Sequence, residues 1–422
     1  MYDLILEGKI VDPVDGVRET RIAIKDNRIE RIDDSLDGRQ VLTTNGYVFP
    51  GFIDPHVHLR DFDWKYKEDY ASGTRAALNG GVTTVIDMPN LPKPTINRER
   101  VLEKKARAAR DAVADVYFYA GVSLDNIVKL EELQDLVVGY KIFTCESTGN
   151  LYLPMDYFDN ALQRIERTNK PVTVHCEDQK INDDLAQALE HTKYAGKHCD
   201  IRPAASEISA ITKVVSAANF RKVPLNIAHI STATGLAIKL SYGRKRPATC
   251  EVTPHHTYFT SDDMQAYGAK LKTYPPFRSD SDKEALLRCL KEGKIEMLAA
   301  DHAPHTLDDK AKGAAGIPGL DDYGRFVSWL LKEQNIDPQR VAQFTSYNAA
   351  KLFGFTDRAR IAEGFLADLT VIDFDEPGKP KQPHKLYTKC GWSPYANEPF
   401  PGNASYVIRG GRVVKTPTGL SI

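Results

Sequence analysis

Two histidines separated by a single residue are the first candidates for chemistry. His56 and His58 follow an apolar run, and residues two apart on a β-strand point to the same side, so one ion could be held by both imidazoles. His175 and His229 end two further apolar runs, and Asp301 ends another. Neutral imidazoles combined with a carboxylate are the ligands that zinc and similar divalent ions favour. The set therefore predicts a metal site.

A single histidine at a strand end is more often a hydrogen-bonded core residue than a metal ligand, and the His-x-His spacing alone is only moderately specific. The metal interpretation depends on the whole set: four histidines at the ends of three predicted strands, with an aspartate at the end of another. Independent coincidence does not explain such a set if the strand ends converge on one place.

Lys141 also ends an apolar run, but it does not fit a simple metal site, because an ammonium would repel a cation. Carboxylation of the amine by carbon dioxide would turn this lysine into an anionic ligand that bridges two metals. The alternative is an uncarboxylated lysine that forms a salt bridge with Asp301 or Glu146. The sequence leaves both interpretations open.

Strands whose ends converge are the elements that must position these side chains. Between residues 50 and 355, a short β-branched run, a polar end and a longer amphipathic stretch repeat. This rhythm is typical of parallel βα units, and stretches such as 97–114 and 206–218 are predicted helices. The predicted strands lie at 53–56, 85–88, 116–119, 139–142, 172–175, 225–229, 250–253 and 297–301. Eight units predict an α/β fold, a closed (β/α)8 TIM barrel with its active site at the strand C-termini.

The two flanks of this region follow a different pattern. Residues 1–49 and 362–422 alternate with a period near two and carry many turn residues. Gly410-Gly411, for example, is a predicted hairpin turn between two short strands. We expect the flanks to pair into one small β-sandwich domain beside a barrel catalytic domain over residues 50–361.

Composition and charge favour a small-molecule substrate. The 422 residues are 42% hydrophobic, enough for a sizeable core. Because 56 basic and 57 acidic residues leave a formal charge of −1, no global field favours nucleic acid or an anionic membrane. The sequence shows neither a secretory signal nor an apolar run long enough to span a bilayer. We therefore expect a cytoplasmic protein, with its six widely spaced cysteines reduced.

Several segments resemble the motifs of the amidohydrolase superfamily. The run Pro50-Gly51-Phe52-Ile53-Asp54-Pro55-His56-Val57-His58 is similar to the first-strand motif of that superfamily. The likeness continues through Gly80-Gly81-Val82-Thr83-Thr84, Met88-Pro89-Asn90, Gly139-Tyr140-Lys141, Val174-His175-Cys176-Glu177, Ala228-His229-Ile230-Ser231-Thr232, Pro254-His255-His256 and Asp301-His302-Ala303-Pro304-His305. The resemblance implies a metal-dependent cyclic amide hydrolase with two Zn²⁺ ions per subunit. His56 and His58 would hold one ion and His175 and His229 the other, with N6-carboxylated Lys141 as the bridge and Asp301 beside the first ion.

Within the superfamily the chain looks most like the dihydroorotases. Arg60 offers a fork suited to a carboxylate, which dihydroorotate carries and hydantoin and allantoin do not. By resemblance, Asn90 and His305 also contact that carboxylate. Three further residues are expected at the substrate: Tyr274, which stands where asparagine is usual, and Ile317 and Pro318 in the last loop. The usual Glu-Pro-Gly after the arginine is replaced here by Asp61-Phe62-Asp63-Trp64, so the loop over the site is expected to differ. Arg60 could instead form an ion pair with Asp61, Asp63 or Glu68.

The expected reaction interconverts L-dihydroorotate and N-carbamoyl-L-aspartate in pyrimidine biosynthesis. A metal-activated hydroxide would attack the ring, with Asp301 as the general base and then the general acid. Two alternatives remain: another cyclic amidase, such as an allantoinase, hydantoinase or dihydropyrimidinase, or a catalytically silent scaffold relative. The resemblance also suggests a homodimer or a complex with aspartate transcarbamoylase as the assembly.

Overall fold

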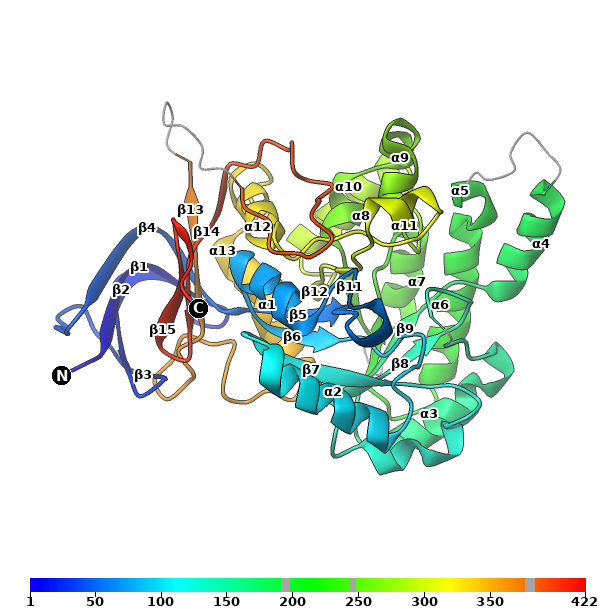
Figure 1. The fold of residues 1–422 in the computed structure, drawn as a ribbon, viewed down its shortest axis with the longest axis horizontal. Helices are drawn as coiled ribbons and strands as arrows, with labels where there is room; N and C mark the ends of the chain where they lie inside the picture. The colour runs from blue at the N-terminus through cyan, green and yellow to red at the C-terminus, as the bar shows by residue number, and fades with distance from the viewer. Residues whose placement is uncertain (150, 191–197, 243–247, 376–383) are drawn as a thin grey trace.

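The computed structural model describes residues 1–149, 151–190, 198–242, 248–375 and 384–422. Two eight-stranded sheets organise these residues. Figure 1 shows the strands β5 to β12 within a layer of helices, and a curved sheet to one side that carries both chain ends. No helix in the described part of the chain is long and apolar enough to cross a membrane.

The first sheet is the predicted barrel, and its eight strands are parallel and follow one another in chain order. A bridge between Val57 and His302 links the last strand region to the first, and the His58 amide donates to the His302 carbonyl at 2.8 Å. The fold prediction is thereby confirmed. The strands are β5 (Phe52–Val57), β6 (Val82–Asp87), β7 (Asp115–Gly121), β8 (Gly139–Phe143), β9 (Val172–His175), β10 (Leu225–Ile227), β11 (Thr249–Val252) and β12 (Met297–Leu298).

Helices cover the outside of the barrel because each buries one apolar side. In α3 (Phe158–Glu166), the residues at positions 158, 161, 162 and 165 are buried, which is the spacing of one helix face. The predicted helices 97–114 and 206–218 form α2 (Arg98–Asp111) and α6 (Ala204–Ala218). The others are α1 (Tyr70–Asn79), α4 (Gln179–Leu189), α5 (His198–Ile201), α7 (Ala233–Tyr242), α8 (Pro254–Tyr258), α9 (Ser261–Tyr267), α10 (Asp280–Lys291), α11 (Leu307–Ala311), α12 (Tyr323–Lys332), α13 (Pro338–Ala342) and α14 (Asn348–Phe353).

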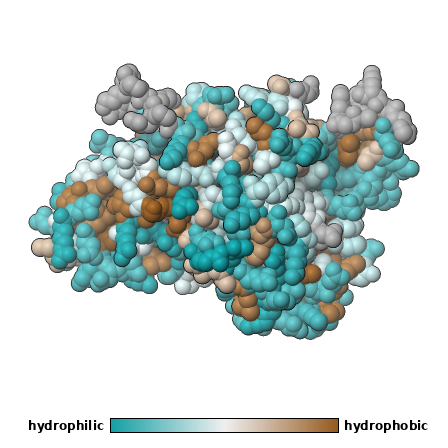
Figure 2. Space-filling model, in the orientation of Figure 1, coloured by the Kyte–Doolittle hydropathy of each residue, from teal (hydrophilic) through white to brown (hydrophobic). Residues whose placement is uncertain are grey.

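The second sheet joins the two flanks of the chain. Its order is β16-β15-β14-β13-β4-β1-β2-β3, so the N-terminal strand β4 pairs directly with the C-terminal strand β13. One face of the sheet encloses an apolar core to which both flanks contribute. Figure 2 shows further apolar residues gathered on the exposed surface over this sheet. The strands are β1 (Leu4–Asp12), β2 (Gly16–Lys25), β3 (Arg28–Ile32), β4 (Val41–Pro50), β13 (Leu369–Phe374), β14 (Gly402–Arg409), β15 (Arg412–Thr416) and β16 (Gly419–Leu420).

The connection between β13 and β14 reaches from this sheet to the barrel mouth, as the orange-red coil of Figure 1 shows. We call its described part, residues 384–401, the strap. Thr388 and Lys389 of the strap donate hydrogen bonds to the buried carboxylate of Glu68. Trp392 Nε1 donates to the His305 carbonyl at 2.7 Å. The C-terminal flank therefore supports two loops at the C-terminal ends of the barrel strands.

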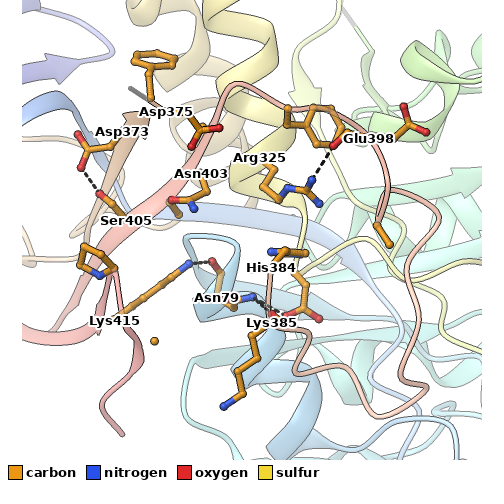
Figure 3. A pocket seen from close by; sticks show the side chains of 18 of the residues that line it. Asn79, Arg325, Asp373, Asp375, His384, Lys385, Glu398, Asn403, Ser405 and Lys415 are labelled. Atoms are coloured by element: carbon orange, nitrogen blue, oxygen red, sulfur yellow. Dashed lines mark hydrogen bonds between the residues drawn. The ribbon is translucent and has the colours of Figure 1, made fainter. Parts of the chain in front are cut away.

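A cavity of about 730 Å³ lies between the strap, the curved sheet and the barrel. Figure 3 shows charged side chains around it that point to neighbouring polar groups. Lys415 donates to the Asn79 carbonyl, Arg325 donates to the Glu398 carbonyl at 2.9 Å, and Ser405 donates to the Asp373 carboxylate at 2.5 Å. These contacts connect the sheet, the strap and the barrel helices to one another.

The backbone packs closely at Gly80 and Gly81, between α1 and β6: Gly80 lies against Leu320, which follows β12, and Gly81 lies against the curved sheet. A Cβ atom at Gly80 would lie 1.9 Å from the carbonyl oxygen of Leu320. Gly81 has a φ of +88°, and its carbonyl accepts from the Thr370 hydroxyl of β13 at 2.6 Å. Only glycine allows the backbone to approach this closely in this conformation.

Substitution Gly80→Ala should lower the free energy of unfolding by about 3 kcal/mol, because the new methyl group overlaps a backbone atom that cannot rotate away. The control is Gly354→Ala, where φ is +78° but nothing lies within 4 Å of the added atom. Only conformational strain, about 1 kcal/mol, is expected there. Thermal and urea unfolding of both variants would measure the difference, and equal losses would contradict the close approach.

Candidate active site

A pocket opens at the C-terminal ends of the barrel strands, where the barrel logic predicts a site. Eight of the side chains selected from the sequence line it, and they lie in or after six of the barrel strands, β5, β6 and β9 to β12. These are His56, His58, Arg60, Asn90, His175, His229, Tyr274 and Asp301. Phe143, Ser147, Thr148, Ala303, Ala315 and Gly316 complete the lining.

The first cluster of ligand atoms lies across the junction of β5 and the end of β12. Asp301 Oδ1 is 3.1 Å from His58 Nε2 and 3.4 Å from His56 Nε2. Ligand atoms of the three side chains lie within 4.8 Å of one another, and all three side chains are buried. Burial raises the pKa of Asp301, whereas positive charge at His56 and a hydrogen bond from His58 lower it to well below its usual range. Positive charge among these side chains, from ring protons or from a bound cation, therefore keeps the carboxylate ionised.

Hydrogen bonds outside this cluster decide which ring nitrogens are free. His56 Nδ1 donates to the carboxylate of Glu251, and His58 Nδ1 donates to Asn90 Oδ1 at 2.8 Å. Since a neutral imidazole carries one N–H, the Nε2 atoms of both rings present lone pairs to Asp301. Burial lowers the pKa of His58 to about 3, so its ring remains neutral. Inward lone pairs facing a carboxylate are the arrangement that a cation satisfies.

The second cluster follows the same logic. His175 Nε2 donates to Glu177 Oε2 at 2.8 Å, which leaves a lone pair on Nδ1. That Nδ1 atom lies 2.9 Å from His229 Nε2. Burial lowers the pKa values of both imidazoles. Two facing imidazole nitrogens are satisfied either by one shared proton or by a common metal ion.

Lys141 is fully buried, and its Nζ atom has no hydrogen-bond partner among the described residues. It forms no ion pair with Asp301 or with Glu146, the two salt-bridge partners considered from the sequence, within the described part of the chain. Burial lowers the pKa of Lys141 to about 8, which favours the uncharged amine. An unpartnered buried amine is costly, and carboxylation requires the uncharged form. The donor set is therefore suited to a metal centre with a carboxylated lysine.

Two carboxylates at the site escaped the sequence analysis. Glu251 is buried within β11 and bonds to His56, and Asn226 of β10 donates to it at 2.9 Å. Glu177 bonds to His175 and also accepts from Arg202 at 2.6 Å. An acidic residue inside an otherwise apolar barrel strand was the available signal for Glu251. For Glu177 the available signal was its position two residues after His175.

Arg60 lies on the pocket wall and is 2% exposed. Its Nη2 atom is 3.2 Å from His305 Nε2, and its Nε atom donates weakly to the Pro304 carbonyl at 3.4 Å. The Nη1 atom is buried without a partner among the described residues. No ion pair within the described part of the chain joins Arg60 to Asp61, Asp63 or Glu68. The guanidinium is therefore a buried cation at the pocket without a carboxylate partner.

The remaining predicted substrate residues differ in their access to the pocket. Tyr274 lines it, and the guanidinium of Arg202 stacks 3.8 Å from the centre of its ring. Ile317 and Pro318 are buried and are not among the described residues that line the pocket. The Ile317 carbonyl accepts from the Ala303 amide at 2.9 Å. This bond ties Ile317 to the segment that follows β12. Ala315 and Gly316 line the pocket in this loop instead.

The backbone is strained where several of these side chains leave their strands. Arg60, His229 and Asp301 have φ angles of 54°, 33° and 42°, a region that side-chain-bearing residues rarely adopt. At Asp301 the preceding turn is held by Asp54, whose carboxylate accepts from the Ala300 amide at 3.0 Å. Strain of this kind persists only where surrounding contacts fix it, and it is frequent at functional sites.

Comparison with known proteins identifies the family of the chain. The model of the amidohydrolase family matches residues 47–414. The dihydroorotase of Halobacterium salinarum is 33% identical over 396 residues, covering 92% of each chain. The dihydroorotase of Pyrococcus furiosus is 33% identical over 415 residues, covering 98% of this chain and 92% of its own. Among solved structures, L-hydantoinase (dihydropyrimidinase) from Arthrobacter aurescens covers 100% of this chain and 98% of its own, with a TM-score of 0.94 at 24% identity. The chain belongs to the amidohydrolase family.

Proposed function

We propose that this protein is a dihydroorotase, which interconverts L-dihydroorotate and N-carbamoyl-L-aspartate in pyrimidine biosynthesis. The observation that carries the proposal is the buried guanidinium of Arg60, which reaches the pocket without a carboxylate partner among the described residues. A substrate carboxylate would supply the missing partner. His305 lies beside Arg60 and Asn90 lines the same pocket, and both are proposed to contact that carboxylate. The dihydroorotase relatives support this choice of acid substrate.

The proposed cofactor is a pair of Zn²⁺ ions. His56, His58 and Asp301 would hold the first ion, His175 and His229 the second, and carboxylated Lys141 both. When bound, such ions polarise the ring carbonyl and supply hydroxide near neutral pH. The inward lone pairs of the imidazoles and the unpartnered Lys141 amine support this assignment.

Asp301 is the proposed proton carrier. Its ionised carboxylate reaches the pocket and has an oxygen in contact with His58. In the hydrolytic direction it accepts a proton from the attacking water and then delivers that proton to the departing ring nitrogen. Arg60 meanwhile holds the ring by its carboxylate, which fixes the carbonyl that reacts. In the reverse direction the same residues close the ring.

The activity test is hydrolysis of L-dihydroorotate by zinc-supplemented protein, with hydantoin, allantoin and dihydrouracil as parallel substrates. We expect turnover of dihydroorotate and a loss of about 100-fold in kcat/KM in Arg60→Met, because a charge-assisted pair is removed. Arg110→Met, on the outer surface of α2, is the matched control and should retain activity. Turnover of the uncharged rings alone would contradict the proposal and favour another cyclic amidase, and no turnover at all with metal bound would favour a scaffold role.

Lysine carboxylation has a direct spectroscopic test. Protein incubated with ¹³C-bicarbonate should show a carbamate ¹³C resonance, and Lys141→Met should lose that resonance, part of the bound zinc and the activity. Lys239→Met is the control, because Lys239 is also buried but is ion-paired with Glu296 at 2.6 Å. A carbamate signal that survives in Lys141→Met would rule out this residue as the carboxylated one.

Glu251 should set the metal affinity through His56. Substitution Glu251→Gln weakens the hydrogen bond that orients the ring, and we expect the zinc affinity to fall by about 10- to 100-fold. Glu296→Gln is the control, because this carboxylate lies just before β12, at the opposite end of the barrel strands. Competition with a zinc chelator would measure both variants, and equal affinities would show that Glu251 has no orienting role.

A further inference from the structure

A lysine outside the predicted site reaches the carboxylate-binding residues from behind. Lys67 is 6% exposed, and its Nζ atom lies 3.0 Å from His305 Nδ1. On the other side of the same ring, His305 Nε2 lies 3.2 Å from Arg60 Nη2. The imidazole of His305 is thus placed between an ammonium and a guanidinium.

Hydrogen-bond accounting limits the state of this ring. An ammonium and a guanidinium only donate, and a neutral imidazole has one acceptor nitrogen, so only one of the two cations can donate to it. The shorter contact is the one from Lys67 Nζ to Nδ1, at 3.0 Å against 3.2 Å for Arg60, and it assigns the acceptor to Nδ1 and the ring proton to Nε2. Burial and the charges of Arg60 and Lys67 lower the pKa of His305 far below its usual range, so a doubly protonated ring is excluded near neutral pH. Burial and the charge of Arg60 lower the pKa of Lys67, and Asp309, 3.6 Å from its Nζ atom, opposes this shift and favours the charged ammonium.

The result is a group of donors at the edge of the pocket, because Arg60 lines the pocket and His305 lies against both Arg60 and the lining residue Gly316. His305 Nε2–H and Arg60 Nη2–H cannot satisfy each other, and Arg60 Nη1 is buried without a partner among the described residues. Two donors from different residues, side by side and buried, suit the two oxygens of a carboxylate.

We propose that Lys67 is a positioning residue for substrate binding, which holds His305 in the Nε2–H tautomer so that His305 and Arg60 together bind the substrate carboxylate. This inference rests on the proposed function for the identity of the acid. It concerns a residue that does not line the pocket itself.

The surroundings hold Lys67 in this position. Its Nζ atom lies 4.8 Å from the centre of the Trp64 ring, and Arg60 Cζ lies 5.3 Å from the same centre. The strap fixes the neighbours of the pair, because Thr388 and Lys389 bond to Glu68 and Trp392 bonds to the His305 carbonyl. The strap therefore holds the backbone of His305 and the residue next to Lys67, which keeps the two side chains in contact.

The functional test compares Lys67→Met with Lys67→Arg, which keeps a donor. Lys65→Met is the matched control, because Lys65 is exposed on the same loop. In zinc-loaded protein, we expect Lys67→Met to raise KM for L-dihydroorotate and Kd for orotate by about 10- to 100-fold, with kcat changed much less. Lys67→Arg should recover most of the affinity, and Lys65→Met should match the parent protein. Unchanged KM and Kd in Lys67→Met would overturn the proposal.

A second readout does not depend on activity. In protein labelled with ¹⁵N in the histidine rings, the His305 signals, assigned by their loss in His305→Gln, should report a proton on Nε2. Lys67→Met should shift them towards a mixture of tautomers. A parent protein with the proton on Nδ1 overturns the inference whatever the substrate is. Correct tautomers in a protein that does not turn over dihydroorotate would instead reject only the proposed function.

Discussion

The direction of a few imidazole lone pairs constrains the whole site. His56, His58 and His175 each donate their outer N–H to an oxygen, from Glu251, Asn90 and Glu177 respectively, so their other nitrogens face inwards. Asp301 joins this cluster only because the barrel closes at the Val57–His302 bridge. Closure brings Asp301 to His58, which lies 243 positions earlier in the sequence. Barrel closure and ring orientation together create an electron-rich centre that needs a cation.

Beside this electron-rich centre lies a group of buried positive charges. Arg60 and Lys67 are buried cations, and the neutral ring between them accepts from only one. In both places we infer that a contact outside the pocket sets the tautomer of a histidine at the pocket or beside it. The proposed substrate is a ring with an amide to be polarised at one end and a carboxylate at the other, and it matches these two environments. The proposed metal centre and the proposed carboxylate-binding residues would thus act on a single substrate.

The sequence pattern predicted the strands well because each apolar run ends in a polar residue, but it overestimated the length of two of them. Residues 225–229 and 297–301 were expected as strands, whereas β10 ends at Ile227 and β12 at Leu298. At β12 the chain turns because Asp54, 246 residues away in sequence, bonds to Ala300. The side chains at strand ends converge as expected. Long-range partners such as Glu251 and Lys67 could not be identified from the pattern, since their roles depend on which distant ring they meet. The same holds for the loop in which Gly316 lines the pocket and Ile317 does not.

The pairing of β4 with β13 also bears on how the chain folds during synthesis. Strands β1 to β4 are synthesised before the barrel, yet β4 gains its antiparallel partner only when residues 369–374 have emerged. An unpaired strand edge is a template for aggregation, so the nascent chain must protect this edge while more than 300 residues are added. The strap follows β13 in the chain, so Trp392 reaches His305 only after residue 392 has been added. The contacts that support His305 therefore form after the barrel strands have been synthesised, and a chain that stopped before the strap would hold a barrel in which His305 lacks this support.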